Sequence, residues 1–318
     1  MRILKLAPAA HLDLDTEVRN AQPRAITTHP ITQITLYSRS GRGVPIIIAL
    51  VCSTVLAALA VCALAQPGDL YVTNLATNTI DVYSPDGVKS TFATGLNSPQ
   101  GLAFDQAHNL YVADGGTGTI FKYDTTGNRT TLYTGLSAPL GLTVNADRLL
   151  VVESGLQRAL SLRLDGSGGA ETIFEGRESM VEVEVARTTY FVTWDTQLEW
   201  DRLRIGGDIP FNAAPRGLTV VHRTVGINDF NVYVATVNGD IWAVRIAHPR
   251  VYFKIFVSGL NDPWGVAFSP RRIGGSDAGE LYVADRAART IFEYTSDAVQ
   301  SVFASDAGTP NFLAFETD

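Results

Sequence analysis

The chain has 318 residues, of which 46% are hydrophobic and 18% charged, a composition typical of an ordered globular protein rather than a disordered one. Its formal net charge is −7 at pH 7, and so acidic a protein repels phosphate backbones, which argues against nucleic acid as a partner. The two cysteines, Cys52 and Cys62, lie in an N-terminal apolar segment, so the sequence after residue 65 has no disulfide and no cysteine-based metal site.

The N-terminal part of the sequence is unlike the rest. Residues 1–43 show no helical or strand periodicity, and we expect them to be disordered, with a translation start downstream near Leu36. Residues 44–65 form an apolar run with a basic flank, which fits a secretory signal peptide cleaved near Ala65 or a single membrane span. Both alternatives place the remaining domain outside the cytoplasm: secreted or periplasmic after cleavage, or anchored to the membrane.

Residues 66–318 consist of repeats of four short apolar runs. The most regular repeat begins at Pro99 and reads PQGLAF, LYVAD, TIFKYD and TTLYTG, with Gly, Asp and Asn between the runs. Such runs, rich in Tyr, Val, Phe and Ile, predict antiparallel strands joined by tight turns. The second run occurs six times, starting at Leu70, Leu110, Leu149, Tyr190, Val232 and Leu281, with successive offsets of 40, 39, 41, 42 and 49 residues. This period predicts an all-β, six-bladed β-propeller of four-stranded blades.

The two ends of this domain complement each other. It begins with a second strand, LYVTN, and its last run, PNFLAF, matches the first strand of the other repeats. We therefore expect strand 312–315 to pair with strand 70–73 and close the ring. Most first strands also contain a proline followed by a glycine, which suits close backbone packing around the central axis. The repeat around Tyr190 departs most, because its opening MVEVEVA has neither residue and no fourth strand is clear.

The pattern P-x-G-[LV]-A-F-D, N-L-Y-V-A-D and T-I-F-x-Y-D resembles the NHL repeat and the repeats of the gluconolactonase–regucalcin superfamily and of virginiamycin B lyase. The resemblance covers roughly residues 68–318. It implies the fold rather than one chemistry, since such propellers serve as lactonases, lyases and binding modules.

The resemblance also implies a ligand site around the mouth of the central channel. Two rings of positions face it: the start of each first strand, and the end of each second strand. In gluconolactonase-like proteins the first ring holds a divalent metal, but here only Asn311 keeps a suitable ligand type. The second ring holds Asp114, Glu153 and Asp285, which are weak catalytic candidates with a divalent cation such as Ca²⁺ as cofactor. Their alternative role is structural, bonding the backbone of the following turn.

The remaining positions favour binding. Two tryptophans and an arginine suit stacking on a sugar or aromatic ring, with charge pairing to an anion. The alternative is that Trp264 plugs the channel and Trp194 packs under its own loop. We expect an exported, monomeric module that binds a small molecule or a protein at the channel mouth; the alternative is a gluconolactonase-like, metal-dependent hydrolase. The candidate ligand-binding residues are Gln100, Met180, Trp194, Arg216, Trp264 and Asn311.

Overall fold

The computed structural model shows a repeated β-sheet domain. It describes residues 68–175, 181–186, 189–194, 197–201, 207–211, 213–222, 229–247, 250–269 and 279–316. The predicted disordered leader, the apolar segment 44–65 and Met180 lie outside the described residues. Within the described part of the chain, no helix is long and apolar enough to cross a membrane.

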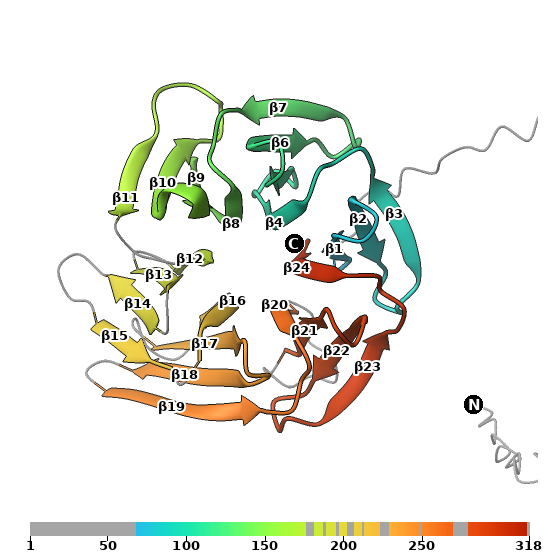
Figure 1. Cartoon of the computed structure of the whole chain (residues 1–318), viewed down its shortest axis with the longest axis vertical. Coiled ribbons are helices and arrows are strands. Elements are labelled where there is room, and N and C mark those ends of the chain that lie inside the picture. The colour runs from blue at the N-terminus through green and yellow to red at the C-terminus, as the bar shows by residue number, and fades with distance from the viewer. Residues whose placement is uncertain are drawn as a thin grey trace, which may run out of the picture. The chain divides into compact units, whose positions relative to one another are not determined.

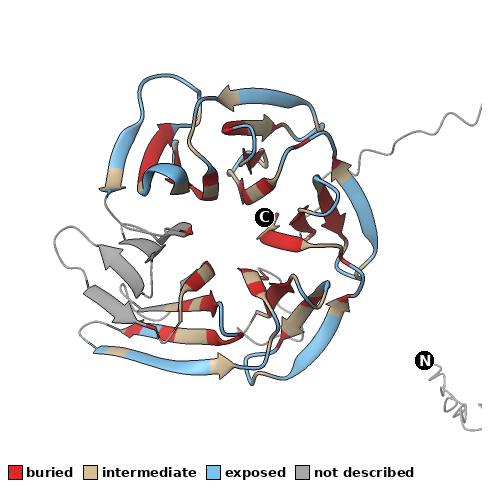
Figure 2. Cartoon of the chain, viewed as in Figure 1, coloured by how far each residue is buried: buried red, intermediate tan, exposed pale blue. Residues whose placement is uncertain are grey.

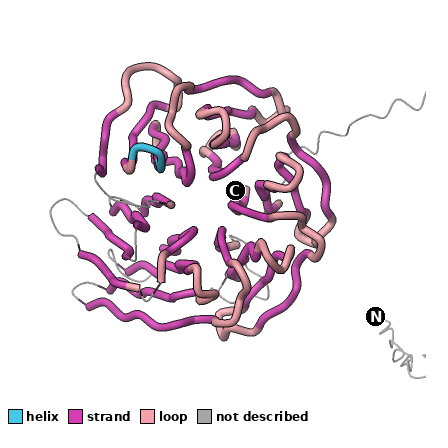
Figure 3. The backbone as a smooth tube through the Cα atoms, in the orientation of Figure 1, coloured by secondary structure: helices cyan, strands magenta, loops and turns pink. Residues whose placement is uncertain are grey.

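Four-stranded antiparallel sheets stand around a central axis, each with its first strand innermost and its last strand outermost (Figures 1 and 3). The first sheet contains β24 (Pro310–Phe315), β1 (Leu70–Asn74), β2 (Thr79–Tyr83) and β3 (Lys89–Ala93). The second contains β4 (Pro99–Phe104), β5 (Leu110–Asp114), β6 (Thr119–Tyr123) and β7 (Arg129–Tyr133). The third contains β8 (Pro139–Asn145), β9 (Arg148–Glu153), β10 (Arg158–Arg163) and β11 (Glu171–Glu175), with the short helix η1 (Ser154–Leu156) after β9.

The other sheets follow in chain order. One contains β12 (Glu182–Ala186), β13 (Thr189–Trp194), β14 (Gln197–Asp201) and β15 (Gly207–Pro210). The next contains β16 (Pro215–His222), β17 (Asp229–Thr236), β18 (Ile241–Ala247) and β19 (Arg250–Val257). The last contains β20 (Pro263–Phe268), β21 (Leu281–Asp285), β22 (Thr290–Tyr294) and β23 (Gln300–Ala304).

The prediction of a six-bladed propeller needs a correction. Five of the sheets have described side chains and pack as blades, whereas the β12–β15 sheet is described by its backbone alone. This is the repeat around Tyr190, whose opening strand lacks the Pro and Gly of the others. Among the residues whose side chains the structure describes, the packing therefore establishes five blades and not the predicted six.

Apolar layers between neighbouring blades form the core. Between the β4–β7 and β8–β11 blades, for example, Tyr111 and Ile120 pack with Leu149, Val151 and Leu160, all of them buried. The alternation of strand residues sends one face of each sheet to either neighbour, so both faces are apolar. Burial is concentrated on the inner and middle strands, and the outer strands are exposed (Figure 2).

The predicted closure is confirmed. β24 pairs antiparallel with β1, in the register Leu70↔Phe315 and Val72↔Leu313. Leu313 is buried in a cluster with Leu70, Val72 and residues of the β20–β23 blade. Segments from the two ends of the domain therefore complete one blade.

The inner strands approach one another closely at their glycines, as expected from the sequence. A Cβ built on Gly265 would lie 2.3 Å from the carbonyl oxygen of Asn311, and one on Gly101 would lie 2.6 Å from that of Leu140. Below these glycines the inner strands enclose a narrow channel of about 230 Å³, lined largely by apolar residues such as Leu142 and Val266.

Two neighbouring carboxyl groups in the β20–β23 blade make stability depend on pH. Burial, together with a hydrogen bond and charge repulsion from Glu293, raises the pKa of Glu280 to about 7. The folded protein therefore retains a proton that the unfolded chain releases at lower pH, so the free energy of unfolding decreases as pH rises toward and through 7. We expect the melting temperature to fall between pH 5 and pH 8, and to fall less in Glu280→Gln. The exposed Glu175→Gln is the control, and equal slopes in both variants would contradict this coupling.

Candidate ligand site at the channel mouth

The inner strands bring several of the predicted ligand-binding residues to one end of the channel. Arg216, Trp264 and Asn311 occupy the second position of β16, β20 and β24, and Gln100 that of β4. Trp194 ends β13, in the sheet described by its backbone alone, so its relation to this cluster stays a prediction.

Trp264 lies between two guanidinium groups. The Cζ atom of Arg216 is 3.9 Å from the centre of its ring, and the Cζ atom of Arg286 is 3.4 Å from it. Carbon atoms in contact sit about 3.5–4.0 Å apart, so two guanidinium groups this close to one ring centre would overlap if they shared a face. Each therefore covers one face of the indole in a cation–π contact. A ligand at the mouth would meet the arginines rather than a bare ring, which replaces the expected stacking on Trp264.

Arg286 was not among the sequence-predicted residues. It follows β21 directly, and its Nη2 donates a hydrogen bond to Oδ1 of Asn311. Asn311 is fully buried, and its Nδ2 donates to Oε1 of Gln100 at 2.8 Å. Gln100 in turn donates to the hydroxyl of Ser98 at 2.9 Å. This series of hydrogen bonds runs across three blades and fixes the orientation of Arg286.

The site carries positive charge that the protein compensates only in part. Burial lowers the pKa of Arg286 to about 10, with the carboxylate of Asp262 opposing the shift and the charge of Arg216 adding to it. Burial also lowers the pKa of Arg216, again opposed by Asp262. Both arginines still carry a charge at neutral pH. Two cations this near to one another are unfavourable unless an anion joins them.

Two hydrogen-bond donors of the cluster lack acceptors. The Nε atom of Arg286 and the indole Nε1 of Trp264 are buried and have no hydrogen-bond partner among the described residues. Nor does Arg286 form an ion pair with any residue in that part of the chain. Because unpaired buried donors cost free energy, an acceptor group from a ligand would stabilise this arrangement.

The three carboxylates of the second ring are almost completely buried and bonded to their own blades. Asp114 accepts the N–H of Asn97 at 2.6 Å and the hydroxyl of Thr117 at 2.5 Å. Glu153 accepts the N–H of Ser137 at 2.6 Å and pairs with Arg158 at 2.6 Å.

Asp285 follows the same scheme, with its Oδ2 accepting the N–H of Asn261 at 2.8 Å and its Oδ1 that of Ala288 at 3.0 Å. In every case the carboxylate holds the loop that leads into the first strand of its blade. These contacts favour the structural alternative, and a catalytic role for the three stays a prediction.

The described residues of the channel mouth lack the carboxylate cluster that a divalent cation needs. In the described part of the chain, no group of three or more His, Cys, Asp or Glu side chains could hold a metal ion. The channel mouth instead presents two guanidinium groups, which repel cations and attract carboxylates. Its chemistry is that of an anion-binding site.

Comparison with known proteins places the fold but no single function. No family model matches the chain, and no curated protein matches it. Among solved structures, a nidogen/laminin complex is similar with a TM-score of 0.65 and 16% identity, covering 77% of this chain and 97% of that one. A virginiamycin B lyase from Staphylococcus aureus is similar with a TM-score of 0.57 and 14% identity, covering 80% and 87%. A gluconolactonase from Xanthomonas campestris is similar with a TM-score of 0.56 and 14% identity, covering 78% and 89%.

These likenesses confirm the predicted resemblance to NHL and gluconolactonase-like propellers at the level of the fold. At such low identity they carry over no substrate and no catalytic residue. The function is therefore inferred from the geometry of the site.

Proposed function

We propose that the protein is a binding module that takes a small carboxylate-bearing molecule at the channel mouth. The observation that carries this proposal is the pair of guanidinium groups on opposite faces of Trp264, one of them without any ion pair among the described residues. An anionic group would accept from the unpaired Nε of Arg286 and offset the repulsion between the two arginines. The carboxylates of Asp114, Glu153 and Asp285 accept hydrogen bonds from their own loops, which supports binding over hydrolysis.

Export of this module is part of the same proposal. It rests on the apolar segment 44–65 and its basic flank, which lie outside the described residues. The solved structures of similar fold include a nidogen/laminin complex and a gluconolactonase, so propellers of this fold include proteins that bind another protein and proteins that act on a small molecule.

The test compares matched charged and neutral probes. Isothermal titration with benzoate and glucuronate should show binding, and the neutral benzamide and glucose should bind at least tenfold more weakly. Arg286→Met should weaken binding of the acids about tenfold to a hundredfold, since a hydrogen bond to a charged group contributes about 1.5–3 kcal/mol. Arg289→Met is the control, because this exposed arginine belongs to the same loop and lies outside the cluster.

Two results would contradict the proposal. One is equal affinity for the acids and their neutral analogues, and the other is unchanged affinity in Arg286→Met. Circular dichroism of each variant shows whether the fold is intact, so that a loss of binding is assigned to the site.

A further inference from the structure

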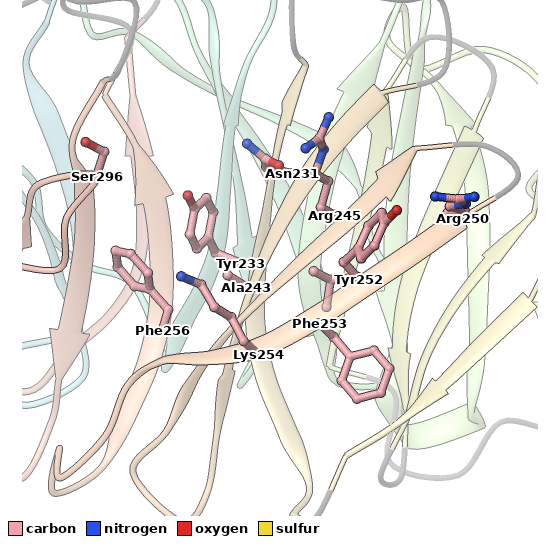
Figure 4. A pocket seen from close by; sticks show the side chains of 11 residues that line it. Asn231, Tyr233, Ala243, Arg245, Arg250, Tyr252, Phe253, Lys254, Phe256 and Ser296 are labelled. Carbon is pink, nitrogen blue, oxygen red and sulfur yellow. The ribbon is translucent and has the colours of Figure 1, made fainter.

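A second concave surface lies on strands β17, β18 and β19 of the β16–β19 blade. It is a groove of about 600 Å³, whose lining includes Tyr233, Arg245, Tyr252, Lys254 and Phe256 (Figure 4). Its volume is within the range of ligand-binding pockets. The alternation along β19 puts Arg250, Tyr252 and Lys254 on one face of the sheet. Phe256, beyond a register shift, lines the same groove against the ring of Tyr233.

The groove exists because one residue of this face is small. Ala243 of β18 lies opposite Tyr233 on one side and Lys254 on the other. In the β4–β7 blade the matching position is Lys122, whose Nζ lies 5.6 Å from the ring centre of Tyr111. In the β20–β23 blade it is Glu293, which accepts a hydrogen bond from Tyr282 at 2.5 Å. A methyl group in this place cannot cover the tyrosine as those side chains do.

The charge of the groove is opposite to that of the protein. Its lining contains Arg245, Arg250 and Lys254 and no Asp or Glu, whereas the whole chain has a net charge of −7. Arg250 and Lys254 make no ion pair with any residue that the structure describes. A cationic, aromatic surface on an acidic protein is complementary to an acidic partner.

The strand beside the groove is an unusual edge. β19 has eight residues, whereas each other outermost strand has four or five. On it Tyr252 is 50% exposed, Phe253 54% and Ile255 45%. Long apolar edges are normally avoided, because their free N–H and C=O groups accept a further strand.

We propose that β19 and its groove bind an extended acidic segment of a partner protein, added to the sheet as one more strand. Alternation then places every second side chain of the segment on the groove face, where acidic groups meet Arg250 and Lys254. The side chains in between lie on the opposite face beside Phe253 and Ile255, which favours apolar residues there. The ligand class is therefore a peptide in which acidic and apolar residues alternate. This surface is independent of the site at the channel mouth.

The test uses a fluorescent eight-residue peptide that alternates Glu and Val, with anisotropy measured against the full chain. Two control peptides change the side chains: a Gln–Val peptide removes the charge, and a peptide with four Glu followed by four Val removes the alternation. Two further controls are Glu–Val peptides in which every second backbone nitrogen is N-methylated. One lacks the N–H donors of the Glu residues and the other lacks those of the Val residues. The Gln–Val peptide and the peptide with four Glu followed by four Val should each bind at least tenfold more weakly than the Glu–Val peptide. The same loss is expected for at least one of the two N-methylated peptides.

Variants of the protein assign the binding to this surface. Ala243→Met fills the groove without changing its charge, and Lys254→Gln removes one positive charge. Each of these variants should bind the Glu–Val peptide at least fivefold more weakly. Lys254→Arg keeps the charge and should bind the peptide like the natural chain. Binding that ignores the charge of the peptide, or that persists unchanged in Ala243→Met and Lys254→Gln, would overturn the proposal. Light scattering gives the other overturning result: a dimer that Ala243→Met dissociates would make a second copy the occupant.

Discussion

Replacing Gly265 by alanine is expected to destabilise the protein by about 3 kcal/mol, because the added methyl group has no space to occupy. Its Cβ would lie 2.3 Å from the carbonyl oxygen of Asn311, 2.9 Å from Cα of Phe312 and 3.1 Å from N of Leu313. All three are backbone atoms of the neighbouring inner strand, so no side-chain rotation relieves the overlap. The strands must move apart instead, which disturbs the packing around the axis.

The measurement is chemical unfolding of the natural chain and of two alanine variants. Gly169→Ala is the control, because a Cβ at that glycine would meet nothing within 4 Å and its backbone does not have a positive φ. It should change stability by less than about 0.5 kcal/mol, as surface substitutions usually do. If the two variants have similar free energies of unfolding, the inner strands can move apart without loss of stability. That result would contradict the expected overlap at Gly265.

Deleting residues 310–318 is expected to abolish cooperative folding. The deletion removes β24, leaves the edge of β1 unpaired, and takes Leu313 out of an apolar cluster shared with Val72 and Tyr282. It also exposes the layer between this blade and its neighbour. We expect a broad thermal transition, or insoluble protein, in place of a single unfolding transition.

Moving the strand rather than deleting it provides the control. Phe315 pairs with Leu70, and the N–H of Gly68 bonds to the carbonyl of Glu316 at 3.2 Å, so the end of β24 lies beside the start of β1. The control variant lacks residues 310–316 at their natural place and carries them instead before Gly68, joined by a short turn. This variant should regain a single cooperative unfolding transition. A deletion variant that unfolds like the natural chain would contradict the role of this strand.

Much of the fold was predictable because turns and alternation are local signals. The LYVAD runs, separated by Gly, Asp and Asn, marked the second strands, and the PNFLAF run revealed the closing strand through its likeness to PQGLAF. The number of blades depended on repeats that these local signals mark unequally. The sheet around Tyr190 was counted as a full blade from one short run, in a part of the chain where Pro and Gly no longer mark the strands.

The candidate site was predicted in part. The repeat pattern shows which positions face the channel mouth, but it does not show which side chains contact one another there. Arg216, Trp264, Gln100 and Asn311 were found from their place at the start of inner strands. Arg286 was missed because it follows the second strand, one residue beyond the ring that was considered. Comparing that next position across the repeats would have found it, since the matching residues after β1 and β5 are Leu75 and Gly115.

The roles of individual side chains depended on contacts that sequence does not contain. Trp264 was expected to offer a face to a ligand, yet Arg286, which is 22 positions further along the chain, covers one face. The groove beside β19 depends on Ala243. An alanine in a strand does not indicate a groove until the structure shows that it pairs with Tyr233.

The pairing of β24 with β1 also bears on how fast the protein folds. The N–H of Phe312 donates to the hydroxyl of Thr73 at 3.0 Å, across 239 positions of the chain. Every other neighbouring strand pair joins segments that are close in sequence, so those hairpins can form early and locally. Folding rates fall as contacting residues become more distant along the chain. We therefore expect the joining of these two strands to be the slow step, which stopped-flow refolding would detect as a late phase sensitive to substitutions in β24.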